Sequence, residues 1–250
     1  MSFWKKKVMD PEQSFVLKRR LILNKNSSFH IQEAYKTLRT NIRFSLHGEG
    51  CKKVCLTSSL ASEGKSTTVL NLAISFAETG SRVLLIDADM RRPSLARLLI
   101  ERAAPGLSNV LAGLDTVEEA IRKDVRPNLD ILFSGAIPPN PLELLGSTTM
   151  KQMIEDLSRR YDYILLDTPP IGIVSDACEV ASLTDGVLFL VRQGETEKEA
   201  VLRSVKQLEL SNAKLLGFVL NGAEESSGKG YKNRYSYRYK YSNDATGKKR

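Results

Sequence analysis

From residue 52 onward, apolar residues alternate between short continuous runs and segments of helical periodicity. The continuous runs are typical of strands buried on both faces and predict strands at 53–57, 82–86, 129–133, 163–166, 186–191 and 215–220. Apolar residues that recur every three or four positions predict helices at 67–79, 94–99, 117–123, 148–160, 175–182 and 198–210. This alternation predicts an α/β fold with a doubly wound, mostly parallel sheet. Ligands of such sheets bind at the carboxyl ends of the strands.

The two ends of the chain lack this alternation. Residues 1–28 show no sustained period and are interpreted as a basic N-terminal arm, partly ordered at best. Residues 29–47 contain a helix, with Ser28 as its N-cap, because apolar residues recur at helical spacing between positions 31 and 46. The proline-rich loop 135–147 is expected to border the site. Residues 224–250 have almost no aliphatic side chains, which predicts a disordered, tyrosine-rich C-terminal tail.

Composition narrows the class of protein. The 250 residues are 42% hydrophobic and 26% charged, as in ordinary soluble domains. The three cysteines have no metal-ligand spacing, which argues against zinc and iron–sulfur sites and fits a reducing cytoplasm. The net charge of +8 is concentrated at the two ends of the chain, while the body between them is mildly acidic. Such basic ends are solvated tails or meet anionic lipid or nucleic acid.

A phosphate-binding loop is predicted between the first strand and the helix that follows it. Ser59-Leu-Ala-Ser-Glu-Gly-Lys-Ser66 matches the Gly-x-x-x-x-Gly-Lys-Ser/Thr pattern, except that Ser59 replaces the first glycine. Backbone N–H groups of such a loop form a nest for phosphate oxygens, and the helix N-terminus adds positive potential. Lys65 is expected to reach the β- and γ-phosphates and the Ser66 hydroxyl to bind Mg²⁺.

Two of the predicted strands end in carboxylates. One runs into Asp87 and, two residues later, Asp89; another ends at Asp167. A buried carboxylate without a positive partner is costly, and Mg²⁺ bound with a nucleotide supplies such a partner. These acids are therefore interpreted as part of a magnesium–nucleotide site. The alternative is that they cap strands or pair with Arg91 and Arg92.

Together these motifs resemble the bacterial tyrosine autokinases, the P-loop type of tyrosine kinase. The resemblance rests on Gly-Lys-Ser-Thr at 64–67, VLLIDADMRRP at 83–93, YILLDTPP at 163–170 and the tyrosine-rich C-terminus. It runs from about residue 30 to the C-terminus, and its closest form is the stand-alone cytoplasmic subunit found beside capsule and exopolysaccharide genes. It implies a P-loop NTPase fold of the MinD/ParA-like type, with residues 29–223 as the kinase domain.

The resemblance also implies a role for each matching residue, with ATP and Mg²⁺ as cofactors. The nucleotide-binding residues would be Ser59, Ala61, Ser62, Glu63, Gly64, Lys65, Ser66, Thr67 and, against adenine, Asn221. The catalytic residues would be Lys65, Asp87, Asp89 and Asp167, and the Mg²⁺ ligands Ser66, Asp87 and Asp167. Asp87 would also activate the incoming tyrosine hydroxyl. Asp176 falls where these kinases have an aspartate of less clear role.

Self-association is implied by Glu33, Lys36 and Arg39, which resemble the Glu-x-x-Arg-x-x-Arg motif through which the family forms rings. Lys36 replaces an arginine, and the two are not equivalent in a bidentate contact. From the residues alone, a solvated face with internal ion pairs is the alternative. The family further implies a membrane-anchored activator, a cognate tyrosine phosphatase and a cytoplasmic location at the inner face of the plasma membrane.

The tail is expected to be the substrate. It holds Tyr231, Tyr235, Tyr237, Tyr239 and Tyr241, interleaved with Lys and Arg. An adjacent subunit would phosphorylate these tyrosines in trans. Each phosphoryl group adds about −1.5 to −2 charges, so phosphorylation would reverse the charge of the tail and separate the subunits.

Three other functions are alternatives to the kinase. A positioning ATPase of the MinD/ParA type carries a lysine where this chain has Leu60. Aromatic and basic residues interleaved in a tail also suit single-stranded nucleic acid, although we regard nucleic acid as an unlikely partner. An iron–sulfur carrier ATPase would need a Cys-x-x-Cys that the chain lacks.

Overall fold

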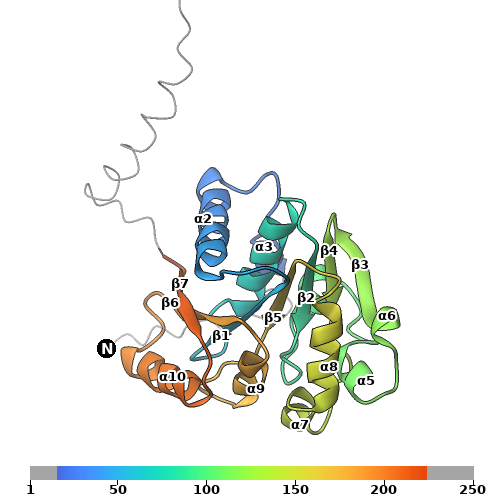
Figure 1. Cartoon of the computed structure of the whole chain (residues 1–250). Coiled ribbons are helices and arrows are strands. Elements are labelled where there is room, and N and C mark those ends of the chain that lie inside the picture. Colours follow the sequence, from blue (N-terminus) through green and yellow to red (C-terminus); the bar gives the residue numbers. More distant parts are fainter. Residues whose placement is uncertain (1–15, 224–250) are drawn as a thin grey trace, which may run out of the picture.

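The computed structural model describes residues 16–223, so the tyrosine cluster and most of the expected N-terminal arm lie outside the described residues. A seven-stranded sheet with the order β3-β4-β2-β5-β1-β6-β7 forms its centre (Figure 1). The strands are β1 (Lys52–Ser58), β2 (Val83–Asp87), β3 (Ile121–Arg126), β4 (Leu129–Leu132), β5 (Tyr163–Asp167), β6 (Gly186–Arg192) and β7 (Leu215–Asn221). All neighbours are parallel except β3 and β4, which confirms the mostly parallel sheet.

Helices cover both faces of this sheet (Figure 1). They are α2 (Phe29–Ser45), α3 (Lys65–Ala77), α4 (Leu95–Leu99), α5 (Leu107–Leu111), α6 (Val117–Ala120), α7 (Pro141–Leu145), α8 (Thr148–Leu157), α9 (Asp176–Ser182) and α10 (Lys198–Leu210). Successive residues of a strand face opposite sides; in β2, Leu84 and Ile86 join the core under α8 and α9, whereas Val83 and Leu85 join the core under α3. Both faces of the strands are therefore buried, which is why their sequences are continuous apolar runs.

The edge strand β3 corrects the expected helix at 117–123. The helix begins as expected, with Thr116 and Glu119 forming a reciprocal cap, but it ends at Ala120. From Ile121 the chain pairs antiparallel with β4, and the register shifts around Asp124, whose φ is +51°. An edge strand is solvated on one side, so β3 carries polar residues and lacks the apolar run that marks the other strands. Helix α7 likewise lies inside the expected loop 135–147, with Pro141 in its first turn, where a missing N–H costs nothing.

The described part of the expected N-terminal arm is packed against α3, which differs from the arm inferred from sequence. Ile22 and Leu23 are buried, and both join the core on the α3 side of the sheet. The Leu23 amide donates to Asn71 Oδ1 at 2.8 Å, and Asn71 Nδ2 donates to the Leu21 carbonyl at 2.8 Å. Residues 21–23 are therefore fixed to α3 through one buried amide side chain.

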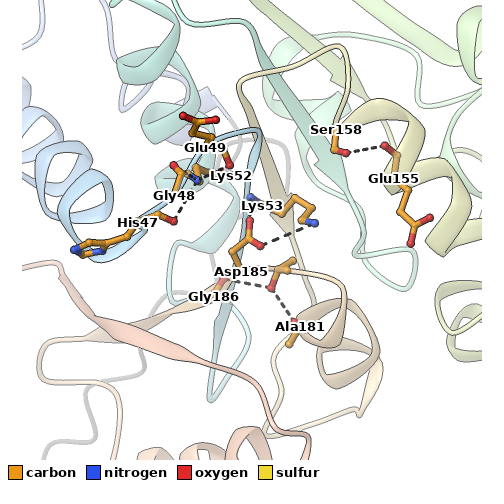
Figure 2. A network of polar contacts seen from close by, with 11 residues as sticks. His47, Gly48, Glu49, Lys52, Lys53, Glu155, Ser158, Ala181, Asp185 and Gly186 are labelled. Carbon is orange, nitrogen blue, oxygen red and sulfur yellow. Dashed lines mark hydrogen bonds and ion pairs between the residues drawn. The ribbon is translucent and has the colours of Figure 1, made fainter.

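A polar network lies at the end of the sheet where the parallel strands begin, and Figure 2 shows it around the start of β1. Lys52 Nζ donates to the Gly48 carbonyl at 2.7 Å, and the Lys53 amide donates to Asp185 Oδ2 at 2.7 Å. The hydroxyl of Thr184 donates to the Ala181 carbonyl at 2.8 Å. In each of these contacts a side-chain group is hydrogen-bonded to a backbone group. The predicted site residues lie at the opposite, carboxyl edge.

Candidate active site

The phosphate-binding loop connects β1 to α3, as its sequence predicts. Gly64, the residue before the helix, has a φ of +100°, a left-handed conformation that favours glycine. A Cβ atom at this position would lie 2.2 Å from Asn221 Nδ2, so a larger residue would displace the Asn221 side chain in addition to straining the backbone. Ser59 and Glu63 are buried, Ala61 and Ser62 are exposed, and Ser66 and Thr67 are half-buried in the first turn of α3.

Lys65, the first residue of α3, is only 7% exposed. Burial lowers the pKa of its ammonium group, while the carboxylates of Asp167, Asp89 and Glu63 act in the opposite direction. An ammonium group among acidic side chains at a helix N-terminus is suited to bind phosphate together with a cation. The structure thus brings Lys65 and the predicted acids into one electrostatic environment.

Asp87 and Asp167 lie opposite each other, at the carboxyl ends of the neighbouring strands β2 and β5. Both are fully buried, and burial is the main cause that raises their pKa values. The pKa of Asp167 is raised to about 7, with Lys65 and the Ser66 hydroxyl acting against the increase. The charges of Asp167 and Asp89 raise the pKa of Asp87 further. Two adjacent buried carboxyl groups therefore meet beside Lys65.

Neither oxygen of Asp167 has a hydrogen-bond partner of normal geometry among the described residues; the Ser66 hydroxyl is close enough to lower the pKa of this carboxyl but does not meet that geometry. The oxygens of Asp87 accept only long bonds, 3.3 Å from the Asp89 amide and 3.4 Å from the Leu95 amide. Such groups are costly unless a cation or donor reaches them. A divalent cation bound with phosphate fits, because Mg²⁺ takes one or two carboxylates and leaves its other positions to phosphate and water. Residues 16–223 contain no cluster of three or more acids, His and Cys that would hold a metal alone.

The other two aspartates at this edge have protein partners. Asp89 Oδ1 accepts from the Arg92 amide at 2.9 Å. Asp176, fully buried at the start of α9, accepts two bonds from Arg91, at 2.7 Å from Nε and 2.9 Å from Nη2. Arg91 is therefore committed to Asp176. Within the described part of the chain, Arg91 makes no ion pair with Asp87, Asp89 or Asp167, so the alternative in which it neutralises them is not supported.

Asn221, expected beside adenine, contacts the phosphate-binding loop in this structure. Its Nδ2 donates to the Glu63 carbonyl at 2.7 Å. The Glu63 side chain accepts from the Leu60 amide at 2.9 Å and from the hydroxyl of Thr196 in the loop after β6. Sequence reasoning missed Thr196, because it lies 133 residues from Glu63 and belongs to no motif. The one available signal was the acidic residue inside an anion-binding loop.

The residues expected to mediate self-association do not form one exposed ridge. Lys36 and Glu33 make an exposed ion pair at 2.8 Å on α2. Arg39 turns towards α3, where its Nη1 donates to the Ser75 carbonyl and, at 3.1 Å, to the Ser75 hydroxyl. The five tail tyrosines lie outside the described residues. The predicted oligomerisation and phosphorylation sites therefore stay predictions.

Comparison with known proteins identifies the family. The AAA domain family matches residues 52–191, more than half of the chain. Tyrosine-protein kinase YwqD of Bacillus subtilis (strain 168) is 41% identical over 194 residues, which cover 78% of this chain and 82% of that protein. The chain belongs to the bacterial tyrosine-protein kinase family. The kinase domain of Escherichia coli tyrosine kinase ETK has the same fold, with a TM-score of 0.75 at 31% identity over 82% of this chain and 84% of that domain.

The fold also extends to the MinD ATPases, as expected. The septum site-determining protein MinD of Pyrococcus horikoshii OT3, whose structure contains Mg-ADP, matches with a TM-score of 0.60 at 25% identity, over 70% of this chain and 72% of that chain. Solved relatives of this bacterial tyrosine-kinase fold thus include one that holds a magnesium–nucleotide complex. Between residues 16 and 223, no helix is long and apolar enough to cross a membrane.

Proposed function

We propose that this chain is a protein-tyrosine kinase that transfers the γ-phosphoryl group of Mg·ATP to the tyrosines at 231–241 of an adjacent copy. The observation that carries the proposal is Asp167, a buried carboxylate without a hydrogen-bond partner beside Lys65. If Asp167 served only to stabilise the fold, its carboxylate would be expected to have a protein partner. The family membership supplies the reaction class, and the tyrosine cluster supplies a substrate within the same chain.

The residues at the carboxyl edge divide the work of in-line phosphoryl transfer. Lys65 and the loop amides stabilise negative charge on the transferring group. Ser66, Asp87 and Asp167 would hold Mg²⁺, which when bound neutralises charge on the β- and γ-phosphate oxygens. The tyrosine oxygen forms its bond to the γ-phosphorus as the bond from phosphorus to the β–γ bridging oxygen breaks, and ADP leaves.

Asp87 is our candidate to orient the tyrosine hydroxyl and accept its proton. An ordinary aspartate is a weak base for a group with a pKa of about 10. In the free protein, burial and the neighbouring charges of Asp167 and Asp89 raise the pKa of Asp87. Mg²⁺ bound to this carboxylate would act in the opposite direction, so the main contribution of Asp87 would be to position the hydroxyl. Asp89, held by the Arg92 amide, would support this arrangement through its charge.

Regulation follows from charge. Unphosphorylated subunits would associate through α2, with Glu33, Lys36 and Arg39 at the contact, and phosphorylate one another's basic tails in a ring. Phosphorylated tails would repel each other, subunits would separate, and a tyrosine phosphatase would reset the cycle. Through a membrane-anchored activator at the inner face of the plasma membrane, the cycle would regulate polymerisation and export of capsular polysaccharide or exopolysaccharide.

The test is incubation of the purified chain with Mg·ATP, followed by intact mass and phosphotyrosine mapping, with Lys65→Ala in parallel. Mass gains confined to residues 231–241 and absent from the variant would support the kinase. ATP hydrolysis without phosphotyrosine, in the presence of the activator's cytoplasmic segment, would instead favour a positioning ATPase. Retention on DNA that survives Lys65→Ala but not removal of the tail would favour nucleic-acid binding.

A further inference from the structure

Three residues tie the phosphate-binding loop to distant parts of the chain. Glu63 lies in the loop, Thr196 in the connection between β6 and α10, and Asn221 at the end of β7. We propose that Asn221 and Thr196 are positioning residues that hold the phosphate-binding loop through Glu63, so that they set its affinity for phosphate groups rather than for the base. This inference rests on the proposed nucleotide-binding function.

Glu63 is the residue through which Thr196 and Asn221 are connected to the loop. Its side chain is only 2% exposed, which is unusual for a glutamate in an anion-binding loop. One carboxylate oxygen, Oε2, accepts from the Leu60 amide three residues earlier, and the other, Oε1, accepts from the Thr196 hydroxyl. The carboxylate thus closes the loop upon itself and joins it to a second element.

Thr196 is oriented for this contact. Its hydroxyl oxygen accepts from the Arg192 amide at 2.9 Å, so its proton is directed to Glu63. Arg192 is the last residue of β6, which lies between β1 and β7 in the sheet. The bonds therefore run from a strand of the rigid sheet, through Thr196 and Glu63, to the Leu60 amide at the start of the loop.

Asn221 holds the loop both by a hydrogen bond to Glu63 and by close contact with Gly64. Its Nδ2 donates to the Glu63 carbonyl at 2.7 Å and occupies the space where a Cβ on Gly64 would lie. Gly64 is held at a φ of +100° directly beneath it, and α3 begins at the next residue. The side-chain amide is thus engaged with the backbone of the loop. Because Asn221 ends β7, the strand that leads to the C-terminal segment also fixes the loop.

Ligands with and without a nucleobase distinguish two possible roles of Asn221: contact with the base and positioning of the phosphate-binding loop. Displacement of a fluorescent ADP analogue would give dissociation constants for Mg·ADP, Mg·GDP and Mg·pyrophosphate. We expect Asn221→Ala and Thr196→Val each to weaken all three by the same factor, on the order of tenfold. Because both residues act through Glu63, the double variant should lose less than the product of the two factors. Thr196→Ser, which keeps the hydroxyl, should restore the wild-type values.

Thr184→Val is the matched control, since the Thr184 hydroxyl donates to the Ala181 carbonyl at the opposite edge of the sheet. It should bind all three ligands as the wild type does. Hydrogen exchange of the nucleotide-free protein gives a second readout: amides 59–64 should exchange faster in Asn221→Ala and Thr196→Val, but not in Thr184→Val.

Four results would overturn the inference. Weaker Mg·ADP binding with unchanged Mg·pyrophosphate binding would mean that Asn221 reads the base. Fully multiplicative effects in the double variant would mean that Asn221 and Thr196 act separately. Variants that bind as the wild type does would refute the tie but leave nucleotide binding intact, whereas a wild type that binds none of the ligands would refute the proposed function as well.

Discussion

Asp167 and Asp176 lie nine positions apart at the same edge of the sheet, and both are fully buried, yet their surroundings differ. Asp176 accepts two hydrogen bonds from Arg91, at 2.7 and 2.9 Å. Asp167 accepts none from the described residues, and burial raises its pKa to about 7. A buried charge is tolerated when it is paired. The unpaired acid therefore lowers the stability of the free protein, and we attribute its presence to a bound cation.

The difference separates a structural acid from a functional one. The ion pair of Arg91 and Asp176 joins the segment after β2 to the start of α9. It therefore fixes the two loops that follow Asp87 and Asp167. Asp167 is left beside Lys65 at the phosphate-binding loop, with Asp87 opposite it on the neighbouring strand. Replacing each acid with its uncharged amide should therefore have opposite consequences.

The largest effect is expected for Asp167→Asn on activity. Loss of the carboxylate should lower the rate of tail phosphorylation by about 100-fold or more, the usual cost of removing one electrostatic contact in an active site. The free energy of unfolding without nucleotide should stay the same or rise, because a buried charge is removed. Phosphate transfer to peptides 231–241 and urea unfolding measure the two quantities. A stability loss as large as that of Asp176→Asn would contradict the distinction.

Asp176→Asn should show the reverse. It breaks a buried ion pair whose arginine is half-exposed, so we expect a loss of about 2 kcal/mol in the free energy of unfolding. The phosphorylation rate should fall far less than in Asp167→Asn. Asp156→Asn is the control, since Asp156 pairs with Arg159 at 3.6 Å on an exposed surface and should contribute less than about 0.5 kcal/mol. Equal losses of unfolding free energy in Asp176→Asn and Asp156→Asn would count against a special role for the pair of Arg91 and Asp176.

The pH dependence of stability provides a third test. A carboxyl group whose pKa is raised on folding binds its proton more tightly in the folded state, so its contribution is full below the unfolded pKa and is lost as pH rises through the folded pKa. For Asp167 this window runs from about pH 4 to about pH 7. The free protein should thus lose on the order of a few kcal/mol across it. Asp167→Asn should make the curve shallower, with the raised pKa of Asp87 responsible for the remaining slope; an unchanged slope would show that Asp167 does not contribute.

The smallest effect compares two cations on α2. Arg39→Met removes bonds to Ser75 on α3 and should cost about 1 kcal/mol of unfolding free energy. Lys36→Met removes only the exposed pair with Glu33 and should cost less than about 0.5 kcal/mol. If α2 mediates association, Lys36→Met should still shift the size-exclusion profile towards smaller species. An unshifted profile would remove Lys36 from the interface.

Most of this arrangement could be predicted from the sequence, because central parallel strands are continuous apolar runs and the site residues follow them directly. Asp87, Asp167 and Lys65 were found in this way. The partners of Asp176 and Glu63 could not be found, since Arg91 and Thr196 meet them only through the packing of distant elements. Strand β3 was missed for a related reason: an exposed edge needs few apolar residues, so Arg122 and Lys123 are compatible with a helix or a strand.

The central claim, that Asp167 is unpaired in order to hold a cation with the nucleotide, is tested most directly by titrating Mg²⁺ into protein saturated with ADP. Calorimetry at pH 8 would compare the wild type with Asp167→Asn and Asp176→Asn. We predict that Asp167→Asn weakens Mg²⁺ binding by at least about tenfold, while Asp176→Asn leaves it within about twofold of the wild type. Equal Mg²⁺ affinity in the wild type and Asp167→Asn would contradict the account.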